Sequence, residues 1–182
     1  MAYDPIASRY AHAAFESAKT TRQVDELLEQ LTHIAGLCRE HENLRRLLYN
    51  PDVDPPEKVA ILQRLMKGSW SDLLRAFLLM VVEAGRAEFL PQIAEAFLAE
   101  VDADRGRLRV VVRSARPLPE ETMARLRALL EHRERKQILV ETQTAPELIA
   151  GVQLMMGHRV VDGSVRRQLV NLRERLSTVR VY

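Results

Sequence analysis

The chain has few of the residues that mark secreted or membrane-spanning proteins. It contains one cysteine, Cys38, among 182 residues, so an internal disulfide is impossible. Cys38 lies in a run with helical spacing, where we expect a small buried residue and not a reactive thiol. The longest run of large apolar residues, Phe77–Val82, has six members, whereas a bilayer span needs roughly 18. The N-terminal residues lack the basic-then-apolar pattern of a secretory signal, and we expect a soluble, cytoplasmic, bacterial protein.

The sequence also lacks the patterns of a catalytic or cofactor-binding site. It has neither a Gly-x-x-x-x-Gly-Lys loop nor a Gly-x-Gly-x-x-Gly loop. No two of its five histidines stand at metal-ligand spacing on one helix face. Glu120 and Glu121 are better explained as favourable charges at a helix start than as an acid–base pair. Ser164 lacks the glycine two residues later that a nucleophile elbow needs. We therefore expect no catalytic residue, no metal and no cofactor, although an enzyme whose site arises only from the fold stays an alternative.

Aromatic residues are scarce, and charge is unevenly divided. Residues 1–104 carry 11 Lys+Arg and 17 Asp+Glu, a net charge of −6, whereas residues 105–182 carry 16 and 8, a net charge of +8. The basic half could belong to a nucleic-acid-binding or regulatory protein. Its only aromatic residue is Tyr182, however, so no stacking platform for bases can form. An acidic protein partner fits the basic half at least as well.

Hydrophobic spacing divides the first hundred residues into six helices with short connections. Asp4 before Pro5 is typical of a helix start. Gly68 and Ser69 are expected to end the fourth helix, and Gly85 the fifth. We expect residues 1–104 to form one domain, an antiparallel six-helix bundle.

The spacing changes from helical to alternating after residue 104. The expected strands are 108–113, Ile138–Thr142, Val152–Met156 and Arg159–Val161, the last two as a hairpin around Gly157-His158. One helix is expected after Pro119 and another after Ser164, which would be its N-cap. Residues 105–182 are therefore predicted to form a small α/β domain, which makes the whole chain α+β.

Two of the predicted helices have more apolar surface than one buried face needs. The first helix is rich in alanine, so another helix could approach it closely. The fifth helix, Leu73–Glu83, is apolar nearly all round. It could simply lie at the centre of its own bundle. Alternatively, it could form a groove with the first helix that receives a partner helix.

Glycines gather where the second half is expected to turn. Gly151, Gly157 and Gly163 are expected at turns that a Cβ would strain. Asp162 is expected to accept hydrogen bonds from nearby backbone N–H groups. Together with Ser164, these residues are expected to shape a binding module without doing chemistry themselves.

Four short motifs occur in the order and spacing of a known family. They are Arg9–Phe15, Glu83–Arg86, Ser114–Leu118 and the signature Leu148–Val152 with Gly157–Arg166 and then Leu169. Together they resemble the delta subunit of bacterial F-type ATP synthase and its mitochondrial relative, the oligomycin sensitivity-conferring protein (OSCP), over essentially the whole chain. The chain departs from the family pattern at Ala84, Ala150 and His158, where Asn, Gly and Asp are more usual.

The resemblance implies a non-catalytic peripheral-stalk subunit, or stator, at the cytoplasmic face of the bacterial membrane. It implies one copy in a hetero-oligomeric complex, with no nucleic acid bound and no insertion into the bilayer. The first domain would bind N-terminal segments of the alpha subunits of the catalytic head, and the second the C-terminal end of stalk subunit b. Residues Tyr10, Ala13, Ala14, Phe77 and Met80 would line the alpha-binding groove. The basic second half would favour an acidic end of subunit b.

Overall fold

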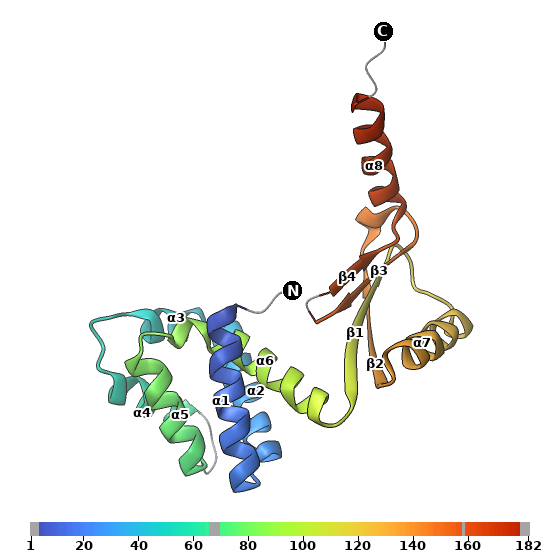
Figure 1. Cartoon of the computed structure of the whole chain (residues 1–182). Coiled ribbons are helices and arrows are strands. Elements are labelled where there is room, and N and C mark those ends of the chain that lie inside the picture. The colour runs from blue at the N-terminus through green and yellow to red at the C-terminus, as the bar shows by residue number, and fades with distance from the viewer. Residues whose placement is uncertain (1–3, 66–69, 158, 179–182) are drawn as a thin grey trace. The chain divides into compact units, whose positions relative to one another are not determined.

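The structure is a computed structural model that describes residues 4–65, 70–157 and 159–178. Within these ranges the chain is mostly helical, with eight α-helices and one four-stranded sheet, which is the α+β class that the sequence predicts. It divides into two compact units: a helical unit that reaches Val101, and a sheet unit that begins at Asp102 (Figure 1).

The described part of the helical unit contains the helices that precede the sheet. They are α1 Pro5–Thr21, α2 Val24–Glu40, α3 Glu42–Tyr49, α4 Pro55–Leu65, α5 Asp72–Glu83, the short 3-10 helix η1 Ala87–Phe89, and α6 Leu90–Asp104. The boundary between the two units falls within the last turn of α6. The predicted end of the fourth helix at Gly68 and Ser69 lies outside the described residues. No helix in the described ranges has the length and apolar character that a bilayer crossing requires.

Short-range contacts explain where several of these helices begin and end. The Asp4 carboxylate accepts a hydrogen bond from the backbone N–H of Ile6 at 2.8 Å, which satisfies one free donor at the start of α1. The Ser71 hydroxyl accepts one from the N–H of Leu74 at 3.2 Å and does the same for α5. Gly85 follows α5 with φ +68°, a left-handed conformation that glycine adopts without strain.

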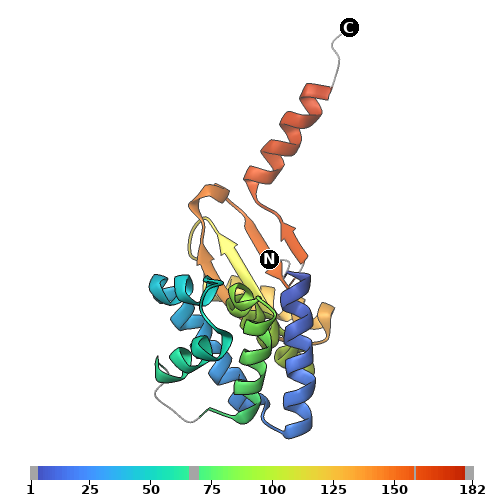
Figure 2. The same ribbon diagram turned by 90° about the vertical axis from the view of Figure 1, so that its left-hand side faces the viewer.

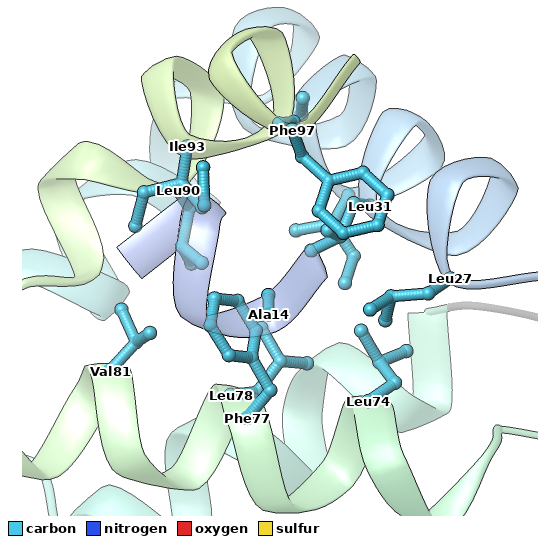
Figure 3. Packing of buried hydrophobic residues seen from close by; sticks show 14 of the residues in the cluster. Ala14, Leu27, Leu31, Leu74, Phe77, Leu78, Val81, Leu90, Ile93 and Phe97 are labelled. Atoms are coloured by element: carbon cyan, nitrogen blue, oxygen red, sulfur yellow. The ribbon is translucent and has the colours of Figure 1, made fainter. Parts of the chain in front are cut away.

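One continuous hydrophobic core joins the helices of this unit. In Figure 3 the labelled side chains of α5 point toward those of α2 and α6, with Ala14 of α1 among them. The rings of Phe15 and Phe97 meet edge to face with their centroids 6.1 Å apart. Cys38 is 1% exposed in this core, and burial raises the pKa of its thiol. Its role is therefore that of a small core residue.

The sheet unit alternates strands and helices. Its described elements are β1 Arg107–Ser114, α7 Glu120–Glu134, β2 Gln137–Thr144, the 3-10 helix η2 Pro146–Leu148, β3 Val152–Met156, β4 Arg159–Asp162 and α8 Val165–Thr178. The strand order is β2-β1-β3-β4. Strands β1 and β2 pair in parallel, as the α7 crossover between them permits, while β3 is antiparallel to both β1 and β4.

One face of this sheet is buried and apolar, and the other is half-exposed and mixes polar with apolar side chains. Along β1 the side chains of Val110, Val112 and Ser114 are buried, and those of Arg109 and Arg113 lie half-exposed on the opposite face. Helix α7 packs against β2 on the apolar side. The resulting core is small, with six buried residues: Val110, Val112, Leu130, Ile138, Leu154 and Met156.

Helix α8 differs from the other described helices in how little of it is covered. Its first turn lies against η2, because the N–H of Val165 donates to the carbonyl of Ala150 at 2.9 Å. Figures 1 and 2 show the rest of α8 extending away from the sheet of its own unit.

Candidate partner-binding surfaces

A hollow of about 240 Å³ opens on the helical unit between α1, α2 and α5. It is lined by Ala13, Ala14, Ser17, Leu27, Leu73, Ala76, Phe77 and Met80. Buried residues form its floor, namely Ala14, Leu27 and Phe77. Exposed residues form its rim, and the largest of them is Met80, which is 44% exposed.

Small side chains and one hydrogen bond explain why the hollow stays open here. On α1 the rim positions are Ala13 and Ser17, which leave the space next to α5 unfilled. The Ser71 hydroxyl donates to the side-chain carbonyl of Gln30 at 2.9 Å and so ties the start of α5 to α2, which contributes Leu27.

The chemistry of the hollow is almost entirely apolar. None of its lining residues is titratable, so it offers no acid, base or metal ligand. Its one hydroxyl, on Ser17, already donates to the carbonyl of Ala13 at 2.9 Å. Such a surface suits the apolar face of another helix.

Four of the five groove residues expected from the sequence line this hollow: Ala13, Ala14, Phe77 and Met80. Tyr10 does not line it and instead lies half-buried against the helical core. The other four lining residues were not expected. Helical spacing could have revealed Ser17, Leu73 and Ala76, because each lies four residues from a predicted member. No local signal exists for Leu27, because it comes from a different helix.

The predicted turn residues of the sheet unit lie mostly together, where β3 begins and β4 ends. Gly151 has φ +83°, and a Cβ there would lie 2.5 Å from the carbonyl oxygen of Gly163. The N–H of Gly163 donates to the carbonyl of Val152 at 3.0 Å. Gly163 itself has no positive φ, and a Cβ there would lie 3.3 Å from that same carbonyl oxygen. Only Gly151 therefore combines a left-handed backbone with a severe backbone clash.

Asp162 and Ser164 connect this turn to α8. The N–H of Ser164 donates to the Asp162 carboxylate at 3.0 Å, and the Ser164 hydroxyl accepts from the N–H of Arg167 at 3.2 Å, as an N-cap does. Hydrogen bonds from the Ser164 side chain and backbone lower the pKa of Asp162. Gly157 lies apart from this group, at the other end of β3, with φ +54° and open space where its Cβ would be.

No pattern in the sequence predicts the backbone conformation of Ile149. Its φ of 69° and ψ of −58° place it in a three-residue turn, closed by a 2.8 Å hydrogen bond from the N–H of Ala150 to the carbonyl of Leu148. This turn is rare and strained, above all for a β-branched residue. The Ile149 side chain is 61% exposed, so core packing does not explain the strain.

Internal ion pairs use part of the positive charge of the sheet unit. Asp102 is 3% exposed and lies 3.1 Å from a guanidinium nitrogen of Arg107 and 3.3 Å from one of Arg109. Arg109 also pairs with Glu141. The basic half therefore offers fewer cations to a nucleic-acid backbone than its composition suggests.

Potential metal ligands do not gather anywhere in the part of the chain that the structure describes: no group of three or more His, Cys, Asp or Glu side chains is placed to hold an ion. What the described residues do show is an apolar hollow on the helical unit and a glycine-containing turn at the start of α8 in the sheet unit.

Comparison with known proteins agrees with a binding role. A family model described as ATP synthase delta (OSCP) subunit matches residues 6–176. The chain is 35% identical over 171 residues to the ATP synthase subunit delta of Symbiobacterium thermophilum, covering 94% of this chain and 92% of that protein. It is 33% identical over 174 residues to the subunit delta of Myxococcus xanthus, covering 94% and 96%.

The fold has a counterpart among solved structures. One chain in the cryo-EM structure of the Toxoplasma gondii mitochondrial ATP synthase hexamer superposes with a TM-score of 0.73 at 25% identity, covering 96% of this chain and 99% of that one. Because both the sequence match and the fold extend over nearly the whole length, the chain belongs to the ATP synthase delta (OSCP) subunit family.

Proposed function

We propose that this chain ties the alpha subunits of the catalytic head to subunit b of the peripheral stalk, and so keeps the head from turning with the rotor. Family membership makes the chain a structural, non-catalytic component of the peripheral stalk, and a peripheral part of a membrane-bound complex. The proposal adds the two partners, the cytoplasmic face of a bacterial membrane as the location, and one copy per complex.

The observation that carries the proposal is the apolar hollow between α1, α2 and α5. An amphipathic helix inserts a few apolar side chains into a groove of this kind, and its specificity comes from shape and not from charge. We assign the hollow to the N-terminal segment of an alpha subunit. In this assignment residues 1–104, as a six-helix bundle, bind the head, and residues 105–182 bind subunit b.

A peptide-binding measurement tests the hollow. Titration calorimetry would compare the full chain with two variants, Phe77→Asp and Met80→Asp, for binding to a peptide of the alpha N-terminal segment. A carboxylate in a desolvated apolar contact is costly, so each variant should bind at least about tenfold more weakly. Met80→Asp is the safer variant, because Met80 is 44% exposed and contributes less to the core than Phe77, which is 6% exposed.

Arg75 provides the matched control, since it is exposed on α5 but does not line the hollow. Arg75→Asp should retain wild-type affinity despite its larger change in charge. Unchanged affinity of a folded Met80→Asp chain would show that the hollow is not the head-binding site. Reconstitution tests the wider role: without this chain, the catalytic head should dissociate from the membrane sector and ATP synthesis should be uncoupled.

A further inference from the structure

A short chain of side-chain hydrogen bonds connects the start of α5 to α2. The Ser71 hydroxyl accepts from the N–H of Leu74 at 3.2 Å and donates to the side-chain carbonyl of Gln30 at 2.9 Å. The side-chain amide of Gln30 in turn donates to the Glu26 carboxylate at 3.3 Å. We call these three bonds the Gln30 network. Because the carboxylate attracts the N–H side of the amide, the amide oxygen is left to face Ser71.

The Gln30 network lies next to the hollow, although neither Gln30 nor Ser71 lines it. Leu27 does line it, and this residue lies one turn before Gln30 on the same face of α2. In α5 the nearest lining residue is Leu73, which lies between Ser71 and Leu74 in the sequence. Figure 3 shows the side chains of Leu27 and Leu74 pointing toward each other. The network therefore joins the two helices at the end of the hollow that Leu27 and Leu73 line.

Apolar packing alone does not fix the position of α5 at this end. The buried face of α5 consists of Leu74, Phe77, Leu78, Val81 and Val82. Burial of apolar surface is not directional, so it tolerates small shifts of one helix against another. A hydrogen bond, in contrast, requires a narrow range of distances and angles. Ser71 is 7% exposed, and a satisfied polar network with so little contact with water makes the packing more rigid.

We propose that Gln30 is a positioning residue for helix binding: it fixes α5 relative to α2 and so keeps the hollow wide enough for the partner helix. The inference rests on the proposed function, which assigns the hollow to an alpha N-terminal segment. It adds a polar residue outside the contact surface that controls the shape of an apolar site. Without the Gln30 network, α5 can shift toward α1, into the space that Ala13 and Ser17 leave unfilled.

Peptide binding to the full chain tests the inference, with a peptide of the alpha N-terminal segment from the same organism as the probe. Gln30→Met keeps the side-chain length and the helix propensity but removes the acceptor for Ser71. Titration calorimetry should show binding that is about three- to tenfold weaker. Because Gln30 does not line the hollow, such a loss acts through the position of α5.

An exchange of two side chains should restore the binding. In the double variant Glu26→Gln with Gln30→Glu, the carboxylate at position 30 accepts from Ser71, and the amide at position 26 donates to that carboxylate. Both hydrogen bonds and the net charge are kept, so the affinity should lie within about twofold of wild type. Gln30→Glu alone has the same shape at position 30 but places two carboxylates four residues apart. It should bind more weakly than the double variant, which a role in packing alone would not produce.

Arg39 provides the matched control on the same helix. It forms an ion pair with Glu95 of α6, and it lies about 18 Å along the axis of α2 from Leu27. Arg39→Met thus removes a polar contact between α2 and a neighbouring helix far from the hollow. It should change the affinity less than about twofold, because an exposed ion pair contributes little. Urea unfolding followed by the fluorescence of Trp70 shows that each variant is folded.

The outcomes separate the inference from the function on which it rests. If wild-type chain does not bind the peptide, or if Met80→Asp binds it equally well, the assignment of the hollow fails and the inference fails with it. If Met80→Asp loses binding but Gln30→Met keeps wild-type affinity, the inference is overturned while the proposed function stands. Equal losses for Gln30→Met and Arg39→Met would also overturn it, as would a double variant that binds no better than Gln30→Glu alone.

Discussion

Among the described residues, the core of the helical unit joins 27 buried residues in one cluster, whereas the core of the sheet unit has six. The structure of the sheet unit depends more on polar and backbone interactions. These are a buried carboxylate between two arginines, a turn that requires glycine, and the N-cap of a helix that extends away from the sheet. Burial of apolar surface is the main stabilising term in folding. We therefore expect the helical unit to be stable by itself, and the sheet unit to depend on polar contacts and on its partner.

The largest expected effect tests the core of the helical unit. Phe97 is fully buried and contacts the ring of Phe15, so Phe97→Ala should lower the free energy of unfolding by about 3–5 kcal/mol. Urea unfolding followed by the fluorescence of Trp70, the single tryptophan, reports on this unit. Met156→Ala, in the small core of the sheet unit, should leave the urea midpoint of the Trp70 transition unchanged. A loss below about 1 kcal/mol for Phe97→Ala would contradict a core-dominated helical unit.

Replacing one glycine in each unit with alanine should change the stability of the protein in opposite directions. Gly151→Ala should cost about 2–3 kcal/mol, because its φ is +83° and the added Cβ meets a backbone carbonyl at 2.5 Å. Gly36 lies within α2 with no atom closer than 4 Å to an added Cβ, so Gly36→Ala should raise stability by about 0.5–1 kcal/mol through helix propensity. Thermal unfolding by circular dichroism measures both. If the Gly151→Ala chain were as stable as wild type, the sheet unit would not depend on glycine at this turn.

The smallest expected losses of stability concern two ion pairs, of which one contains the buried carboxylate. Asp102→Ala removes the carboxylate that Arg107 and Arg109 share, although Arg109 keeps its ion pair with Glu141. Breaking a fully buried pair costs roughly 3–5 kcal/mol. The side chains of Arg107 and Arg109 are 26% and 37% exposed, so we expect about 2 kcal/mol. Arg125→Ala breaks an ion pair whose two side chains are more than 70% exposed, and should cost less than about 0.5 kcal/mol. If Asp102→Ala and Arg125→Ala lowered the free energy of unfolding in urea equally, burial would not strengthen the ion pairs of Asp102.

Local signals in the sequence were enough for the elements and much of the groove. Asp4 and Ser164 predict helix starts, and alternation of apolar residues predicts β1. These features depend on neighbours along the chain, which is why a pattern can reveal them. The family resemblance, and not spacing alone, pointed to Ala13 and Phe77, which both line the hollow.

Features that depend on distant neighbours were missed. Leu27 lines the hollow because α2 packs beside α1 and α5. Tyr10 shares a face of α1 with Ala13 and Ala14 but lies one turn nearer the start of the helix, outside the hollow. Net charge overstated the free basic surface, since it cannot show that Asp102 is enclosed by arginines. No residue preference indicates the positive φ of Ile149, because β-branched residues rarely adopt it.

The alanines of α1 also bear on the entropy of binding. An alanine side chain has no rotamer to lose, and Phe77 on the floor of the hollow is already fixed by burial. Ordering a helix in the hollow therefore restricts few side chains on this protein, chiefly the exposed and flexible Met80. In the proposed function, a hollow with so few flexible side chains would hold a partner helix at a low entropic cost, while Met80 could adapt to small differences in the sequence of that helix.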